Sequence, residues 1–180
     1  CGTGMGFSVQ KQHISCLPNL RVPDAKTKTF QPEDSIQGWS DAIGVLINSY
    51  FTEGEFPDYR GLTVKFDYSK IRPEGSLIAG QFKAPGHKGL ETAIEKIRDL
   101  LNKRLKQESF KTGEFAGKMR PIDAYDTICL ASDAVLSGGV RRSATICIFS
   151  LDDNEMRDAK TGNWFSENPQ RGRSNNSAAR

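Results

Sequence analysis

The segment from residue 121 to residue 150 constrains the fold most, because it joins a helical pattern to a strand pattern through two glycines. Apolar side chains recur at three- and four-residue steps after Pro121, which predicts a helix with one buried face. Gly138-Gly139 is typical of a helix end. The stretch 144–149 is apolar at most positions and predicts a strand that could be covered on both faces. The segment therefore predicts a helix that ends at the glycines and leads into a strand.

Two more helices and a second strand are predicted before this segment. Apolar residues recur with helical spacing from Ile36 to Phe51 and again over 90–105, where charged residues occupy the other face. Asp34 and Ser35 precede the first of these helices and can accept hydrogen bonds from its free N–H groups. Residues 62–67 alternate between apolar and polar side chains, which predicts a strand.

The remaining segments show weaker patterns. Residues 10–33 contain three prolines and little periodicity, so an irregular connection is expected there. Residues 107–120 form a polar connection, and residues 152–161 are expected to form a short acidic turn or helix. The tail after Asn168 is expected to be loosely ordered by itself.

Composition excludes several classes of protein. A length of 180 residues suits one ordinary domain or a piece of a larger one. The mean hydropathy is −0.52, and no apolar run approaches the ~18 residues that a membrane span needs, so no membrane segment is expected. With 25 Lys and Arg against 22 Asp and Glu, the net charge of +3 argues against a dedicated nucleic-acid binder. The first residue is not Met, so we expect a processed chain or an internal segment.

The cysteines favour a reducing compartment. Four are widely spaced and form no C-x-x-C pair: Cys1, Cys16, Cys129 and Cys147. We interpret them as reduced thiols of a cytoplasmic protein, two of them buried. His13 and His87 do not stand at ligand spacing from them, so no metal site is predicted.

Three glycine-containing loops could bind phosphate. Gly2-x-Gly4-x-Gly6 lets backbone N–H groups approach an anion, although it also fits a plain tight turn. The loop 137–144 offers two arginines for a phosphate or a base edge, or else it is a helix end followed by solvated arginines. The loop 171–177 is either a flexible basic tail or a polar strand end that lines a site.

Two pairs of carboxylates could take part in acid–base chemistry. Asp152-Asp153 and the pair Asp123 and Asp126 have no nucleophile or metal ligand beside them in the sequence. We therefore interpret them as solvated or capping acids. Cys1 has no neighbouring base and is interpreted as a spectator.

Five short motifs, taken together and in order, resemble the large catalytic chain of ribonucleotide reductases, and most closely the adenosylcobalamin-dependent (class II) monomeric ribonucleoside-triphosphate reductases. The motifs are Cys-Gly-Thr-Gly-Met-Gly-Phe-Ser-Val at 1–9, Glu-Asp-Ser-Ile-Gln-Gly-Trp at 33–39, Phe-Asp-Tyr-Ser-Lys-Ile-Arg-Pro-Glu-Gly at 66–75, Ser-Gly-Gly-Val-Arg-Arg-Ser-Ala at 137–144 and Arg-Ser-Asn-Asn-Ser at 173–177. The resemblance extends over essentially the whole chain.

The resemblance implies part of a ten-stranded α/β barrel with a helical insertion. It implies that the complete enzyme makes 2′-deoxyribonucleotides from ribonucleotides with a cysteine radical generated by adenosylcobalamin, while two further cysteines reduce the sugar. The radical cysteine of the family lies in an Asn-Pro-Cys motif, which this sequence lacks. No catalytic residue is therefore assigned here, and the segment alone is expected to be inactive.

The resemblance also divides the chain and assigns its sites. Residues 1–9 would form a glycine-rich loop and a barrel strand. Residues 10–62 would form an insertion that imitates the dimer contact of other reductases, and residues 63–180 a barrel segment. Gly2 and Arg141 correspond to substrate-binding positions. A deoxynucleoside triphosphate effector would sit between the insertion and a specificity loop made of Ser137, Gly138, Gly139, Val140, Arg141, Arg142 and Ser143.

The resemblance implies a thioredoxin-like reductant, a monomeric complete enzyme, a cytoplasmic location, and no direct contact with nucleic acid or membrane. Two alternatives stay open at this point. One is a reductase of another class with a different radical generator, and the other is a stand-alone nucleotide-binding regulatory module.

Two expectations concern the edges of the segment. Cys1 at a glycine-rich loop fits an intein splice junction, where the residue after the splice point must be Cys, Ser or Thr, and it fits an ordinary gene fragment equally well. A broken barrel would leave the strands at 62–67 and 143–150 unpaired, so the isolated segment is expected to be poorly soluble or molten.

Overall fold

A computed structural model describes residues 4–78, 82–136 and 145–179 of the chain. The elements are β1 (Met5–Ser8), α1 (Lys11–Ser15), β2 (Asp24–Phe30), α2 (Ile36–Tyr50), η1 (Pro57–Tyr59), β3 (Leu62–Phe66), β4 (Leu77–Ile78), β5 (Phe82–Lys83), α3 (Lys88–Lys106), η2 (Glu108–Phe110), α4 (Pro121–Leu136), β6 (Thr145–Ser150), α5 (Asn154–Arg157), α6 (Trp164–Glu167), η3 (Pro169–Arg173) and β7 (Ser174–Ala179). The architecture is α/β with parallel sheets, as the resemblance implies.

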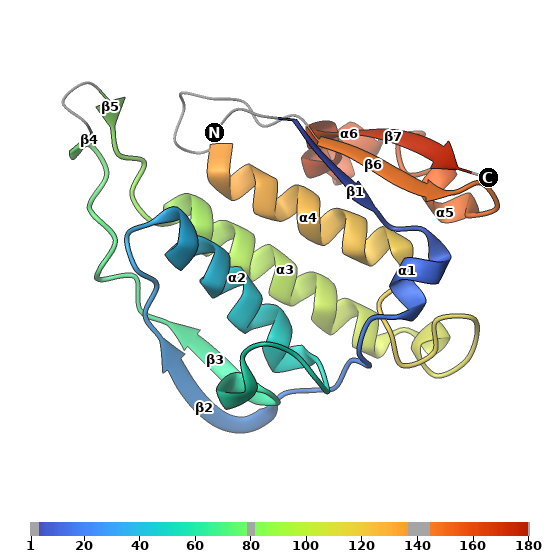
Figure 1. Cartoon of the computed structure of the whole chain (residues 1–180), viewed down its shortest axis with the longest axis horizontal. Helices are drawn as coiled ribbons and strands as arrows, with labels where there is room; N and C mark the ends of the chain where they lie inside the picture. The colour runs from blue at the N-terminus through green and yellow to red at the C-terminus, as the bar shows by residue number, and fades with distance from the viewer. Residues whose placement is uncertain (1–3, 79–81, 137–144, 180) are drawn as a thin grey trace.

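The described strands form two parallel sheets and one short hairpin. One sheet has the order β1-β6-β7, and the other pairs β2 with β3. β4 and β5 form an antiparallel hairpin that projects from the body of the molecule (Figure 1). The sheets lie on opposite sides of the long helices α2, α3 and α4 (Figure 1).

The hydrophobic core fills the space between these helices and the sheet β1-β6-β7. Leu46 of α2, Ile97 of α3, Tyr125 of α4 and Cys147 of β6 belong to it, and each has almost no solvent exposure. α4 lies between α3 and the sheet, so it buries side chains on two sides (Figure 1). The three helices predicted from periodicity are confirmed, because apolar side chains at helical spacing form one continuous core.

The start of α2 confirms one sequence prediction and corrects another. Ser35 caps the helix, since its Oγ accepts a hydrogen bond of 3.0 Å from the N–H of Gly38. The side chain of Asp34 does not cap the helix and instead forms an ion pair with Arg72. Ile36 was expected on the buried face, but 84% of it is exposed because it occupies the first helical position, beyond the end of the core.

The prediction of an irregular connection over 10–33 is wrong. This segment contains α1 and the seven-residue strand β2, which pairs in parallel with β3. β2 alternates lysine and threonine instead of apolar and polar residues, and most of its side chains are exposed. Its strand conformation depends on backbone pairing with β3, which the residue pattern does not encode.

The expectation of unpaired strand edges is wrong for β6 within the described residues, whereas β3 pairs with β2 on one side and keeps its other edge unpaired there. β6 is the central strand of its sheet, with β1 on one side and β7 on the other. The tail that was expected to be loosely ordered supplies β7. One face of β6 packs on α4, whereas Ile146 on the other face is 44% exposed, so β6 is covered on one face and not on both.

The division of the chain at residues 62 and 63 stays a prediction. β2 lies before this boundary and β3 begins at it, and the two strands pair along their length. The 10–62 segment is therefore joined to the following one by a shared sheet.

Candidate functional site

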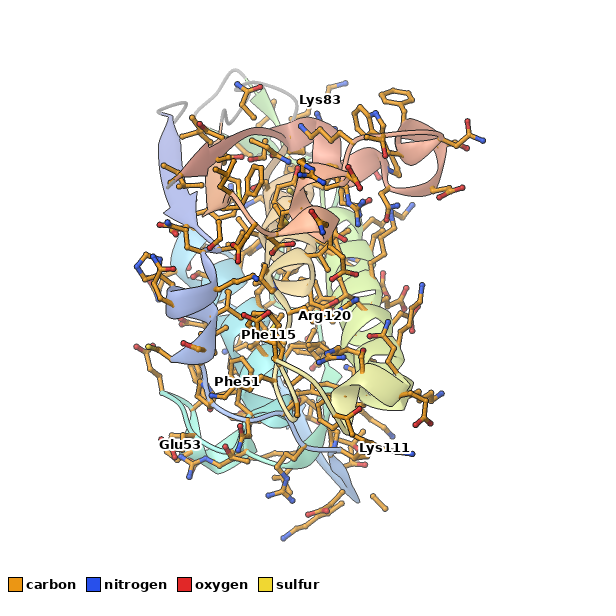
Figure 2. The ribbon with its side chains drawn as sticks, turned by 90° about the vertical axis from the view of Figure 1, so that its right-hand side faces the viewer. Phe51, Glu53, Lys83, Lys111, Phe115 and Arg120 are labelled. Atoms are coloured by element: carbon orange, nitrogen blue, oxygen red, sulfur yellow. The ribbon has the colours of Figure 1, made fainter. Side chains whose placement is uncertain are left out.

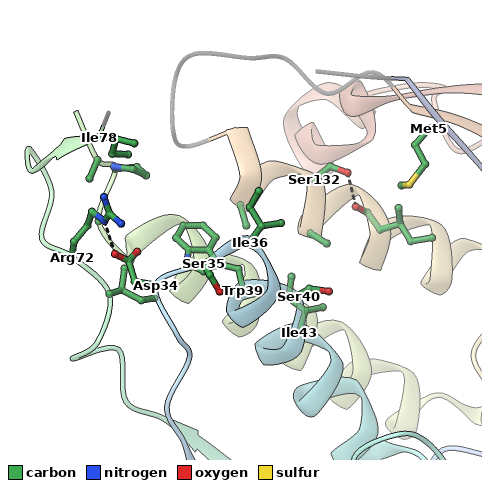
Figure 3. A pocket seen from close by; sticks show the side chains of 17 residues that line it. Met5, Asp34, Ser35, Ile36, Trp39, Ser40, Ile43, Arg72, Ile78 and Ser132 are labelled. Carbon is green, nitrogen blue, oxygen red and sulfur yellow. Dashed lines mark hydrogen bonds and ion pairs between the residues drawn. The ribbon is translucent and has the colours of Figure 1, made fainter. Parts of the chain in front are cut away.

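A cavity of about 580 Å³ lies between the start of α2, the last turns of α4 and the segment that carries the β4–β5 hairpin. Its lining is mainly apolar, and Figure 3 shows several of these side chains directed into it. The residues that line it are Met5, Asp34, Ser35, Ile36, Trp39, Ser40, Ile43, Ile71, Arg72, Ile78, Ala84, Pro85, Gly86, Ile128, Ala131, Ser132 and Ala134.

One end of the cavity is charged. Nε of Arg72 donates a hydrogen bond to Oδ2 of Asp34, which joins the turn after β3 to the residue before the α2 cap. Both side chains keep contact with solvent, at 42% exposure for Arg72 and 30% for Asp34. Lys70 and Glu33 form a parallel ion pair next to this one, and neither residue lines the cavity.

The middle of the cavity is apolar. Ile36 and the half-buried Trp39 face it from successive turns of α2, and Ile128 and Ala131 face it from α4. The 84% exposure of Ile36 is explained by this position, because its side chain lines an open hollow instead of the core. An exposed isoleucine beside a half-buried tryptophan provides a surface suited to a flat, weakly polar group.

Two glycines shape the third wall. Gly75 has φ +88° and Gly86 has φ +69°, which are left-handed conformations that favour glycine. A Cβ on Gly86 would lie 3.1 Å from the backbone nitrogen of Glu74, so a larger residue would push the two arms of this segment apart. The N–H of Gly75 donates to the carbonyl of Ala84 at 2.9 Å, which closes the base of the hairpin beside the cavity.

The site residues predicted from the sequence lie outside the described residues. This applies to Gly2 and to the whole specificity loop, including Arg141. The loop follows α4 directly in the chain, and Ala131 and Ala134 near the end of α4 line the cavity. The predicted roles of Gly2 and of residues 137–143 stay predictions.

No binding role is predicted from the sequence for Arg72, Trp39 or Ile36. The signal was present, because Trp39 and Ile36 lie in the 33–39 motif and Arg72 lies in the 66–75 motif. These motifs are separated in the chain by the length of α2 and β3, and only the tertiary structure brings them to one cavity.

The three described cysteines are free, and none is part of the cavity. Cys129 and Cys147 lie in the core between α4 and β6, where burial raises the pKa of each thiol to about 12. Both therefore stay protonated at neutral pH and are poor nucleophiles. Cys16 is exposed at the end of α1.

Asp123 and Asp126 are not solvated, so that part of the interpretation is wrong. Asp123 does cap the start of α4, since its Oδ2 accepts a hydrogen bond of 2.9 Å from the N–H of Arg120, the residue before the helix. Both are buried on α4, where Asp123 pairs with Arg120 at 2.8 Å and Asp126 pairs with Arg171 at 2.6 Å. In the view of Figure 2, Arg120 lies near the middle and Lys111 near the edge of the molecule. Asp153 caps α5 by accepting a hydrogen bond from the N–H of Met156, as the sequence predicts.

A buried arginine continues the same network. Arg104 has 1% exposure, lies 3.5 Å from Asp123 and donates hydrogen bonds to the carbonyls of Lys118 and Phe115. These contacts fix the polar connection after α3. Each charged group of this network has a hydrogen-bonding or ionic partner, so we assign the network a structural role.

The described part of the chain contains no group of three or more His, Cys, Asp or Glu residues that could hold a metal ion. Among the same residues, no helix is both long enough and apolar enough to cross a membrane.

Comparison with solved structures identifies the fold as that of one part of a class II ribonucleotide reductase. A crystal structure of a B12-dependent (class II) ribonucleotide reductase matches with a TM-score of 0.76 and 23% sequence identity, over 99% of this chain and 27% of that one. No model of a known protein family matches the sequence.

Sequence comparison makes the relationship more particular, because the chain is homologous to adenosylcobalamin-dependent ribonucleoside-triphosphate reductases. The enzyme of Lactobacillus delbrueckii subsp. bulgaricus is 28% identical over 88% of this chain and 24% of its own. The enzyme of Lactobacillus helveticus is 31% identical over 86% and 24%. A protein of Dictyostelium discoideum described as a probable enzyme of this kind is 32% identical over 79% and 16%. The resemblance inferred from the five motifs is confirmed, and the chain spans about a quarter of the length of the Lactobacillus relatives.

Proposed function

We propose that this chain is the effector-binding and specificity segment of an adenosylcobalamin-dependent ribonucleoside-triphosphate reductase, and that it forms part of the substrate wall. The reaction of the complete enzyme would be the conversion of ribonucleotides to 2′-deoxyribonucleotides. The observation that carries the proposal is sequence similarity to enzymes of this name over most of the chain, joined to a matching fold over 99% of it.

Three features of the sheet β1-β6-β7 support the proposal that it is part of a ten-stranded α/β barrel. Its strands are parallel, α4 covers one face, and Ile146 on the other face is left 44% exposed. In a barrel, helices cover the outer face of the strands and the inner face is filled by other parts of the chain. The exposed face of this sheet would then be the inner face.

The cavity is our candidate for the effector site. It lies where α2, in the proposed insertion, meets the end of α4, which leads into the proposed specificity loop. A deoxynucleoside triphosphate has an aromatic base, which suits the surface of Ile36 and Trp39, and an anionic triphosphate, which suits the guanidinium of Arg72. A flat apolar surface with an arginine at one end matches both parts of this ligand.

The described residues do not provide a place for the cobalamin. His13 contacts the hydroxyl of Ser8 with 2.7 Å between Nδ1 and Oγ, and His87 stacks on Tyr68 and lies 3.5 Å from Glu91. Among the described residues, neither histidine lines any of the three cavities beside α2, α3 and α4, and the buried cysteines belong to the core. We therefore assign the contacts of the cofactor to other parts of the protein.

The remaining partners of the proposal follow from the same family. The ribonucleotide substrate would meet Gly2 and Arg141, a thioredoxin-like protein would supply the electrons, and the complete enzyme would be monomeric and cytoplasmic. Three free thiols among the described cysteines support a reducing compartment.

Direct binding of deoxynucleoside triphosphates to the full chain tests the effector site. Calorimetric titration with each of the four nucleotides should show one site, and Arg72→Gln should weaken binding roughly 10- to 100-fold, because a charge-assisted hydrogen bond to phosphate is lost. Lys70→Gln is the matched control, since Lys70 is a neighbouring cation that does not line the cavity.

Turnover separates the enzyme from a stand-alone regulatory module. The complete protein that contains this segment should reduce ribonucleotides when adenosylcobalamin and a dithiol are supplied. Nucleotide binding without turnover in that complete protein would favour the module, and absence of nucleotide binding would remove the effector site from the cavity.

A further inference from the structure

The ion pair between Asp34 and Arg72 raises a question about the cavity that the proposed function leaves open. The cation that would meet the phosphates already has an anionic partner in the empty site, and both residues line the cavity. If the ion pair served only to join the two segments, its charges would not need to line the cavity, whose wall is otherwise mainly apolar.

We propose that Asp34 is a built-in competitor for the phosphate groups of the ligand, so that it lowers both the affinity of the site for triphosphates and its preference for them over less charged nucleotides. This inference rests on the proposed function. The carboxylate neutralises Arg72 while the site is empty, and it repels the triphosphate when the ligand arrives. Binding then exchanges the partner of Arg72 from carboxylate to phosphate.

The exposure of the pair makes this exchange feasible. At 42% and 30% exposure, the two side chains are screened by water, and an exposed ion pair changes an equilibrium by no more than about fivefold. A charge-assisted contact between arginine and a multiply charged phosphate is stronger, because it changes a binding constant roughly 10- to 100-fold. A triphosphate therefore displaces Asp34 from Arg72, whereas an uncharged nucleoside has nothing with which to displace it.

The position of Asp34 explains why its loss need not damage the site. The cap of α2 is formed by Ser35 and not by Asp34, so the helix start does not depend on this carboxylate. The neighbouring pair of Lys70 and Glu33 continues to join the same two segments when the Asp34 carboxylate is removed.

Nucleotide affinity of the Asp34→Asn variant tests the inference, measured by calorimetry on the full chain with dATP, dGTP, dCTP and dTTP. The nucleotide that binds the wild type most tightly should bind the variant roughly two- to fivefold more tightly. The corresponding monophosphate should gain less and the nucleoside should not gain at all. Glu33→Gln is the matched control, because it removes a neighbouring carboxylate that does not line the cavity, and it should leave the affinity unchanged.

The direction of the change in triphosphate affinity distinguishes a structural role of Asp34 from competition with phosphate. If Asp34 only holds Arg72 in place, Asp34→Asn weakens triphosphate binding or leaves it unchanged, and this inference is overturned while the effector site stands. Asp34→Ser provides a second carboxylate-free variant in case the first is unstable. Failure of the wild type to bind any of the four nucleotides would overturn the proposed effector site itself, and the inference with it.

Discussion

The guanidinium of Arg171 holds the carboxylate of Asp126 by two hydrogen bonds, 2.7 Å from Nε to Oδ1 and 2.6 Å from Nη2 to Oδ2. Its third nitrogen, Nη1, donates to the carbonyl of Ala159 at 2.8 Å. The pair fastens the segment before β7 to α4, and it lies at 13% and 9% side-chain exposure. β7 therefore reaches its place beside β6 from an anchored start.

Loss of one partner of this pair should be strongly destabilising. In Asp126→Ala, Arg171 is left as an uncompensated buried charge, and we expect a loss of about 3–5 kcal/mol in the free energy of unfolding. Urea denaturation followed by circular dichroism measures it. The control is Glu108→Gln, because Glu108 and Lys111 form an exposed ion pair that should contribute less than ~1 kcal/mol. Equal effects of the two variants would contradict a structural role for the buried pair.

Gly38 should not tolerate even alanine. A Cβ at this position would lie 2.3 Å from the carbonyl oxygen of Glu33, and because the obstacle is backbone, the start of α2 would have to shift. We expect Gly38→Ala to destabilise the protein by about 1–3 kcal/mol, although alanine favours helices. Gly172→Ala is the control, since a Cβ there meets nothing within 4 Å. Thermal unfolding of both variants compares them, and a stabilised Gly38→Ala would show that the helix start can move freely.

The three described cysteines should differ sharply in reactivity. Cys16 is exposed and should react with a thiol reagent in the native protein at neutral pH, whereas the buried Cys129 and Cys147 should react only after unfolding. Mass spectrometry after labelling, with and without urea, identifies the modified residues. Labelling of Cys129 in the native state at the rate of Cys16 would show that the contact between α4 and β6 opens readily.

Stability should fall in alkaline solution. Burial raises the pKa of Cys129 and Cys147 to about 12, from an ordinary value near 9.0. The unfolded chain therefore loses these protons first as the pH rises, and the free energy of unfolding declines above about pH 9, by up to ~1.4 kcal/mol per pH unit for each thiol. Below about pH 8 both states keep the protons, and the contribution is complete.

Urea denaturation between about pH 8 and about pH 10 measures this slope. Alanine at Cys129 and Cys147 should flatten it, whatever the loss of stability from the smaller side chains. Alanine at the exposed Cys16 should leave it unchanged. A slope that persists without the two buried thiols would assign it to other groups.

Arg141 carries a prediction that comes from the family resemblance alone. Gly138 and Gly139 precede Arg141 in the sequence, and glycine adopts more than one backbone conformation at low cost, so effector binding could favour one of them. Arg141→Ala in the complete protein should weaken substrate binding and flatten the effector-dependent choice among substrates, by a coupling of ~1–3 kcal/mol. Lysine should restore this only in part, because it lacks the planar fork. Turnover of each substrate with each effector measures the selectivity, and unchanged selectivity would return Arg141 to the role of a solvated arginine.

The sequence predicts the elements whose information is local. The apolar spacing of α2, α3 and α4 requires burial of one helix face, and the alternation in β3 and β6 requires a sheet, so these elements follow from periodicity. The motifs at 33–39 and 66–75 also mark the residues that line the cavity, although not what they do there. These features can be predicted from short stretches of sequence, because apolar side chains at regular spacing favour burial on one face of a helix or strand.

Only the tertiary structure decides the elements and contacts that depend on distant partners. β2 and β7 are polar strands, and they exist because their backbones pair with β3 and β6, which periodicity cannot report. Ile36 completes a helical pattern but lies beyond the core, so its exposure depends on where the neighbouring elements end. The ion pair of Asp34 and Arg72 joins residues 38 positions apart. The sequence supplies the charges, and the packing of α2 against the turn after β3 decides that they meet at a cavity.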